Sequence, residues 1–215
     1  MTARLVSLRV GRIAPLGPER VASAFLKSAV NGPVMAGALG LDGDSQADLS
    51  VHGGPEKAVY AYPAARYADW AVAFPELAPR FVAGAMGENL TVEDMVEDDI
   101  CVGDMHAIGG ALLQVCQPRQ PCFKLALALG EPRLGKHMVR TGHSGWYYRV
   151  LQEGTISPGD AVTLVERPNP DFAFPRLVRI VNLGGATLHE LQALAEMPGI
   201  ASNIGNRARA SLRAA

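Results

Sequence analysis

The chain contains 215 residues, of which 48% are hydrophobic and 19% are charged, so it can bury a substantial core. This composition argues against an intrinsically disordered protein and against a coiled coil. Twenty Lys and Arg residues against 21 Asp and Glu residues leave a formal charge of -1, so no overall positive field attracts a nucleic acid polymer. We expect one main globular domain, in which any anion site is local.

The sequence predicts neither a targeting segment nor a membrane span. Three arginines interrupt the apolar residues of the stretch 1–13, which is unlike the hydrophobic region of a signal peptide. The uncharged run 105–118 contains polar residues and is too short to cross a bilayer. We therefore expect a cytoplasmic protein without membrane contact.

Glycine and proline separate many short apolar runs in the first 170 residues, a pattern typical of a β-domain with frequent turns. Residues 6–10 alternate between apolar and more polar side chains, as a half-buried strand does. Further strands are predicted at Val34–Leu39, Ala58–Tyr62, Ala111–Cys116, Trp146–Leu151 and Ala161–Val165. Gly-Asp pairs at 43–44, 103–104 and 159–160 indicate turns, and the last two pairs directly precede apolar runs.

Helices are predicted to be few in this part of the chain. One is expected at Ala64–Ala73, after Pro63, and another at Phe123–Leu129, after Pro121. Since these do not form a βαβ series, the sequence favours a mainly β fold, either a barrel or a folded antiparallel sheet.

The composition changes at Arg167–Pro170, where two prolines stop any strand. We therefore predict a β-domain over residues 1–167 and a short helical extension over residues 171–215. In that extension Thr187–Glu190 matches a capping box, and Pro198-Gly199 ends the helix that it opens. A second helix is predicted at Ala201–Ala214.

The three cysteines lack the spacing of a zinc site or of a disulfide framework, so we expect free thiols. Cys101 and Cys116 lie in strand-like runs, where cysteine is usually a small buried hydrophobic residue. Cys122 lies between Arg119 and Lys124 at the predicted start of a helix. Cationic neighbours and a helix N-terminus favour the thiolate, which is the metal-binding form. We predict that Cys122 is the reactive cysteine, with a structural role as the alternative.

Other segments carry polar groups suited to an anion or a heterocycle. His52 and Lys57 flank the turn 53–55, where glycines let the backbone approach a ligand closely. Lys27 lies among hydroxyl-bearing residues and is suited to a phosphate, and the amide of Asn89 is suited to the edge of a heterocycle. A capping or core histidine, a solvated lysine and a turn asparagine are the ordinary alternatives. The common motifs of nucleotide-binding proteins, zinc proteases and serine hydrolases are absent from the sequence.

Taken together, these segments resemble the MOSC domain, the family named for the C-terminal domain of molybdenum-cofactor sulfurases. The segments that carry the resemblance are Gly40–Asp44, Asp48–Gly54, Lys57–Val59, Gly87–Thr91, Val102–Asp104 and Gln117–Cys122. The similarity covers residues 1–167. Residues 142–150 and 154–160 also resemble a stand-alone bacterial branch, typified by a 6-N-hydroxylaminopurine resistance protein, and the helical tail resembles the three-helix extension of that branch.

The resemblance implies a β-barrel with a pocket for a molybdenum cofactor of the molybdopterin type. Cys122 corresponds to the family's cysteine, which is a metal ligand or a sulfur carrier. The residues carried over as cofactor-binding are Lys27, His52, Lys57, Asn89 and Arg119. Phe123 and Ser23 stand where the family commonly has Trp and Thr, and both changes keep the chemical type. Sulfurases also contain a pyridoxal-phosphate domain, for which this chain has no room.

The implied function is a molybdenum-dependent oxidoreductase that reduces N-hydroxylated bases or related compounds. One alternative is a carrier that delivers the cofactor or a sulfur atom from Cys122. Another is a cofactor-free thiol enzyme that uses Cys122 and His52. Because the sequence contains no flavin, haem or iron–sulfur motif, a reductase needs a separate electron-donor protein. We expect a small-molecule substrate and leave a homodimer open.

Overall fold

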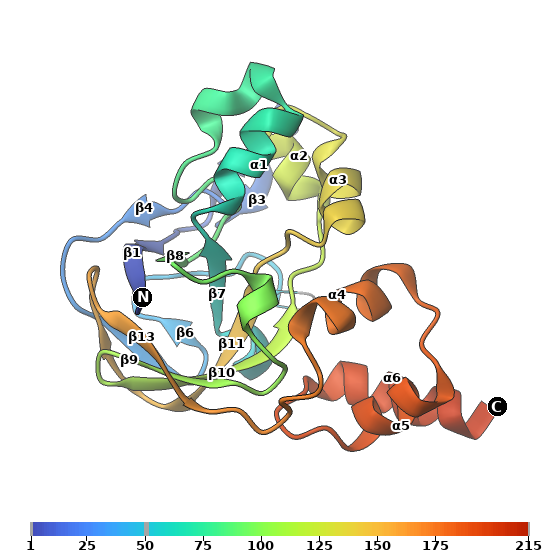
Figure 1. The fold of residues 1–215 in the computed structure, drawn as a ribbon. Coiled ribbons are helices and arrows are strands. Elements are labelled where there is room, and N and C mark those ends of the chain that lie inside the picture. The colour runs from blue at the N-terminus through green and yellow to red at the C-terminus, as the bar shows by residue number, and fades with distance from the viewer. Residues whose placement is uncertain (1, 50–51, 215) are drawn as a thin grey trace.

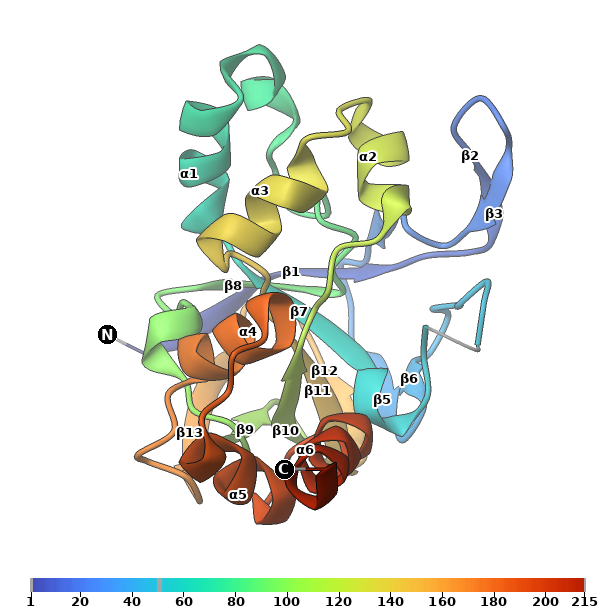
Figure 2. The same cartoon turned by 90° about the vertical axis from the view of Figure 1, so that its right-hand side faces the viewer.

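A closed β-barrel lies between two groups of helices in the computed structural model, which describes residues 2–49 and 52–214 (Figures 1 and 2). The seven barrel strands are β1 (Ala3–Val10), β7 (Val59–Pro63), β8 (Leu90–Glu93), β9 (Met105–Ile108), β10 (Ala111–Pro118), β11 (Trp146–Gln152) and β13 (Ala161–Glu166). Their order is β13-β9-β10-β11-β7-β8-β1, and pairing of β1 with β13 closes the ring. The predicted mainly β, barrel-type fold is confirmed.

The barrel is antiparallel except where β7 runs parallel to β8. The short strand β4 (Ser28–Ala29) extends the sheet from β1. A separate sheet contains β5 (Val34–Gly37), β6 (Gly40–Leu41) and β12 (Gly154–Ile156), and β2 (Ala14–Leu16) pairs with β3 (Val21–Ser23). The strand predicted at Val34–Leu39 is confirmed over Val34–Gly37, but it ends two residues early because the chain turns after Gly37 and pairs with itself as β5 and β6.

Three helices cover one side of the barrel (Figure 2). They are α1 (Arg66–Ala73), α2 (Phe123–Leu129) and α3 (Leu134–Thr141), and short 3-10 helices lie at Pro55–Lys57, Pro75–Arg80 and Glu97–Asp99. A second hydrophobic cluster, separate from the main core, joins Trp70 of α1, Leu125 of α2 and Met138 of α3 to Tyr62 of β7. Helix α1 begins two residues later than predicted, and α3 was not predicted.

Three helices also form the C-terminal extension: α4 (Phe174–Leu183), α5 (Leu188–Glu196) and α6 (Ser202–Ala214). The capping box of α5 is confirmed, because Thr187 accepts from the Glu190 amide and Glu190 accepts from the Thr187 amide. Phe174 of α4 packs edge-on against Trp146 of β11, with ring centroids 6.4 Å apart. The extension therefore shares the main hydrophobic core with the barrel. The division into domains 1–167 and 171–215 stays a prediction.

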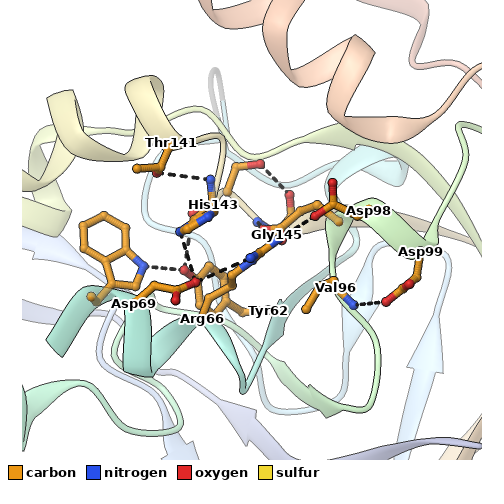
Figure 3. Close-up of polar contacts among 12 residues, drawn as sticks. Tyr62, Arg66, Asp69, Val96, Asp98, Asp99, Thr141, His143 and Gly145 are labelled. Carbon is orange, nitrogen blue, oxygen red and sulfur yellow. Dashed lines mark hydrogen bonds and ion pairs between the residues drawn. The ribbon is translucent and has the colours of Figure 1, made fainter. Parts of the chain in front are cut away.

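A polar cluster fixes the chain where it enters β11 (Figure 3). Arg66 of α1 donates to Glu97 from Nε and to Asp98 from Nη2, both over 2.8 Å. The other carboxylate oxygen of Glu97 accepts from the Gly145 amide over 2.9 Å. This cluster holds α1, the 3-10 helix 97–99 and the start of β11 together, and so sets the position of Tyr147 in that strand. Across residues 2–49 and 52–214, no helix has both the length and the apolar character needed to cross a membrane.

Candidate functional site

A cavity that is partly open to solvent lies where several loops meet the strands β7 and β11. Every residue that the sequence singled out for a ligand lines this cavity: Lys27, His52, Lys57, Asn89, Arg119 and Cys122. These residues come from separate segments of the chain, so only the closed fold brings them together.

Cys122 and Arg119 form the centre of the cavity wall. Cys122 is the N-cap residue of α2 and has an extended backbone, with φ -124° and ψ 160°. Its Sγ lies 3.9 Å from Nη2 of Arg119, which donates toward it. The Arg119 guanidinium is 5.1 Å from the ring centroid of Tyr60 and 5.5 Å from that of Phe25. Two aromatic faces thus hold a buried cation beside the thiol.

Arg119 has an unused hydrogen-bond donor. The residue is only 5% exposed, and its Nη1 is buried without a hydrogen-bond partner among the residues that the structure describes. Leaving a charged donor unpaired costs free energy, and an anion seated in the cavity would remove that cost. The geometry therefore favours a negatively charged ligand at this point.

Asp44 connects the cavity floor to the N-terminal segment. Its Oδ1 accepts from Lys27 Nζ over 2.5 Å and from the Gly11 amide over 2.6 Å, while Oδ2 accepts from Asn89 Nδ2 over 3.0 Å. Both the Lys27 and the Asp44 side chains are almost fully buried. Lys27 therefore faces the cavity as half of an ion pair, with much of its charge balanced by Asp44.

The amide of Asn89 is already occupied by the protein. Its Nδ2 donates to the Arg9 carbonyl over 3.1 Å as well as to Asp44, and its Oδ1 accepts from the Tyr60 amide over 3.1 Å. Both amide hydrogens are thus used, so in this arrangement Asn89 positions Asp44 and β7. Binding of a heterocycle by Asn89 stays a prediction, and it requires exchange of one of these bonds.

Glycine is favoured at two turns near the cavity. Gly87 has φ +76°, and a Cβ there would lie 2.9 Å from the Phe25 ring. Gly54 has φ +80° and precedes the short helix 55–57 that carries Lys57. Positive φ is readily adopted by glycine alone among the common residues, so these two positions let the loops turn tightly around the cavity.

Comparison with known proteins establishes the family. The family model of the MOSC domain matches residues 48–163, which include most of the cavity residues. This chain belongs to the MOSC domain family. It is 43% identical to the YiiM protein of Escherichia coli over 150 residues, which cover 70% of this chain and 67% of that protein.

Solved structures agree with this membership. The crystal structure of YiiM from Geobacillus stearothermophilus has a TM-score of 0.81 and 34% identity, and the match covers 98% of this chain and 99% of that one. The crystal structure of YiiM from Escherichia coli has a TM-score of 0.79 and 30% identity, with 94% of each chain covered. The predicted resemblance to this branch of the MOSC family is therefore confirmed.

The chain is also similar to one part of a longer protein. The chain is 39% identical over 197 residues to a protein of Gibberella moniliformis named "Reductase". The match covers 90% of this chain but spans only 35% of the length of that fungal protein.

The surroundings of the MOSC cysteine make it acidic. Burial by itself raises the pKa of Cys122, but a hydrogen bond with His52, the charge of Arg119 and the backbone amide of Lys124 together lower it to about 7. Cys116, fully buried beneath the site, has its pKa raised by burial to about 12. All three thiols are free, as predicted. Of the three, only Cys122 combines access to the cavity with thiolate character near neutral pH.

Several residues of the MOSC cavity were not predicted from the sequence to contact a ligand. Lys124 is buried and adds a cation, while Tyr147 lies 5.2 Å, centroid to centroid, from the Tyr60 ring. The sequence carried one weak indication that Asp44 has a different role from Asp104 and Asp160. Its Gly-Asp pair is the one that is not followed by an apolar run. The other two pairs are strand-entry turns as predicted, since Asp104 and Asp160 each accept from a backbone amide three residues earlier.

The acidity of Cys122 gives a direct prediction. In cofactor-free protein, the rate of Cys122 alkylation by iodoacetamide should rise with pH through a midpoint near 7, because the thiolate reacts and the thiol does not. His52→Ala should move that midpoint upward, since a hydrogen bond that favours the thiolate is lost. Peptide mass spectrometry of samples quenched across the pH range measures both. A midpoint that His52→Ala leaves unchanged would contradict the contact.

Proposed function

We propose that this MOSC protein holds a molybdenum cofactor of the molybdopterin type in the cavity and reduces N-hydroxylated bases or related compounds, with Cys122 as its thiolate ligand to the metal. The observation that carries the proposal is the pairing of an acidic, accessible thiol with a buried Arg119 whose Nη1 has no partner. That pairing offers one metal ligand and one anion donor side by side.

The charges that line the cavity fit such a cofactor. Four cationic side chains and one carboxylate face the cavity: Lys27, Lys57, Arg119, Lys124 and Asp44. This excess of positive charge suits the phosphate and the anionic sulfur atoms of a molybdopterin. Within the described residues, no group of three His, Cys, Asp or Glu side chains is placed to hold a metal ion. Cys122 would therefore be a single protein ligand, and the cofactor would supply others.

The bound cofactor would supply the transfer of two electrons to the N–O bond. The N-hydroxyl group takes up two electrons and two protons, the N–O bond breaks, and the products are the amine and water. For its part the protein holds the Cys122 thiolate, which His52 and Arg119 stabilise, and attracts the anionic cofactor through Arg119 and its cationic neighbours. Tyr60 and Phe25 present aromatic faces to Arg119 and restrict its position.

We propose that a separate electron-donor protein supplies the electrons, because no flavin, haem or iron–sulfur motif is found within these 215 residues. Similarity to a fungal protein named "Reductase" supports a reductive reaction, although this chain spans only 35% of that protein. A small-molecule substrate suits a partly open cavity lined by polar and aromatic side chains.

The test is to produce the chain in a host that makes molybdenum cofactor and to measure molybdenum and pterin per chain. The same protein is then incubated with a hydroxylaminopurine and a chemical electron donor. We expect stoichiometric metal and formation of the aminopurine. Bound cofactor without turnover would favour the carrier alternative, in which Cys122 delivers the cofactor or a sulfur atom. Absence of cofactor from the purified protein, together with turnover, would favour the thiol enzyme.

A further inference from the structure

Glu56 links the cavity loop to the last helix of the chain. Glu56 belongs to the 3-10 helix 55–57, and its carboxylate accepts from the first residue of α6. The Ser202 amide donates to both Glu56 oxygens, over 2.8 and 3.0 Å, and Ser202 Oγ donates to Oε1 over 2.6 Å. Two segments 146 residues apart in sequence are thus joined at a helix N-terminus, where a carboxylate also interacts favourably with the helix dipole.

Arg149 of β11 completes this junction from the barrel side. Its Nη2 donates to Glu56 Oε1 over 2.8 Å, and its Nη1 donates to Gln114 Oε1 over 3.0 Å. Burial raises the pKa of Glu56, but the hydrogen bonds from Ser202 and the charge of Arg149 outweigh that effect and lower it. Glu56 is therefore ionised at neutral pH, and its charge lies between a helix N-terminus and a guanidinium.

The backbone of Glu56 is held as well as its side chain. Its carbonyl oxygen accepts from Gln117 Nε2 over 2.8 Å and from the Cys116 thiol over 3.0 Å. Those two residues lie in β10, directly before the segment that carries Arg119 and Cys122. Glu56 is thus fixed on one side by β10 and on the other side by α6.

Backbone hydrogen bonds also hold the loop that Glu56 anchors: the His52 amide donates to the Asp48 carbonyl over 2.9 Å, and the Lys57 amide donates to the Gly54 carbonyl over 3.0 Å. His52 lies four residues before Glu56, across Gly53 and Gly54, which have φ of +83° and +80°. Glycines with positive φ turn readily but lose the most conformational entropy on ordering, so contacts at the end of the loop must hold it. A shift of Glu56 would be transmitted through these two residues to the His52 side chain.

From this geometry we infer that Glu56 is a positioning residue and that α6, acting through it, holds His52 and Lys57 at the cavity beside Cys122. The C-terminal extension then contributes to the geometry of the site, because it positions two of the side chains that line the cavity. The inference rests on the proposed function only in treating the cavity as the functional site, because nothing in it depends on which cofactor binds.

The chain offers a matched control for this inference. Glu190 is also a carboxylate at the N-terminus of a tail helix: it accepts from the Thr187 amide over 2.8 Å and from Arg176 and Arg179 over 2.8 and 2.7 Å. None of these residues lines the cavity. Glu190→Ala therefore removes a comparable cap from the same extension without touching the loop.

The experiment compares full-length, cofactor-free wild type, Glu56→Ala, Glu56→Gln and Glu190→Ala. Hydrogen exchange is measured on the peptide that spans residues 52–60, and the alkylation rate of Cys122 is measured at pH 7. We expect Glu56→Ala to speed exchange in that peptide about tenfold and to slow alkylation about threefold, because the loop loosens and the contact from His52 to Cys122 is lost. Glu56→Gln should fall between, since its amide oxygen still accepts from Ser202 but carries no charge for Arg149.

Glu190→Ala should lower the thermal midpoint while leaving exchange in 52–60 and Cys122 alkylation at wild-type rates. The inference is overturned if Glu56→Ala and Glu56→Gln behave as Glu190→Ala does, with a lower midpoint and an unchanged loop and thiol. If Glu56→Ala does not fold, the Glu56→Gln comparison decides alone. Because no cofactor takes part, failure here leaves the proposed function standing, and failure of cofactor binding leaves this result standing.

Discussion

Replacing Cys122 with alanine should abolish molybdenum-dependent reduction while leaving the fold intact. The change removes the thiolate that we propose as the protein's metal ligand, so both metal content and turnover should be lost. The residue is partly exposed at a helix N-cap and is not part of the main hydrophobic core. We therefore expect the free energy of unfolding to change by less than about 1 kcal/mol.

Cys101→Ala is the control for this prediction. Cys101 is buried and does not line the cavity, so its loss should lower stability by about 1–3 kcal/mol without changing cofactor binding. Molybdenum content, thermal midpoint and reduction of a hydroxylaminopurine are compared after loading of wild type and both variants. Undiminished turnover in Cys122→Ala would rule out the ligand role.

Replacing Arg119 with methionine should weaken cofactor retention by about 10- to 100-fold, the loss expected from one or two hydrogen bonds to a charged group. Methionine keeps the length and the apolar stem of the side chain but offers no donor. The same change should not reduce stability, and a modest gain is expected. The reason is that wild-type Arg119 is a buried cation with an unpartnered Nη1, and such a group is costly to desolvate.

In Arg119→Met, cofactor retention should fall while stability stays the same or rises. A variant that merely unfolds would lower both, so the two measurements distinguish these cases. Pterin content of protein purified from a cofactor-competent host reports retention, and the thermal midpoint of the cofactor-free form reports stability. Arg80→Met is the matched control: Arg80 donates to two backbone carbonyls of α2, both over 2.7 Å, and does not line the cavity. Arg80→Met should lower the midpoint and retain cofactor. Full pterin content in Arg119→Met would show that the anion is held elsewhere.

Local signals in the sequence were sufficient for much of the fold. The alternation in residues 6–10 indicated β1, the Gly-Asp pairs at 103–104 and 159–160 indicated strand-entry turns, and the Thr187–Glu190 capping box indicated the start of α5. These features depend on residues a few positions apart, so a single sequence carries them completely. Helix α4 was missed although Phe174, Leu177 and Val178 have helical spacing, because the nearby prolines indicated a linker.

Some features of the candidate site could likewise be predicted from the sequence, and others could not. Cationic neighbours and a predicted helix start are local features, and they sufficed to indicate Cys122 as the reactive thiol, whose pKa its surroundings in the fold do lower. The sequence alone did not reveal the ion pair between Lys27 and Asp44 or the full use of the Asn89 amide inside the protein. Those contacts join residues that are 17 to 80 positions apart in the sequence, and they form only when the barrel closes.

Tertiary structure alone also decided how the C-terminal extension contacts the loop beside the cavity. Nothing local to Glu56 or Ser202 indicates that one caps the other, because the contact forms only after β10, β11 and α6 have packed together. The sequence by itself thus determined which side chains could carry charge, bind metal or begin a helix. Long-range packing determined which of those side chains face a ligand and which are occupied by other residues of the protein, since each buried polar group takes the partner that the folded core places next to it.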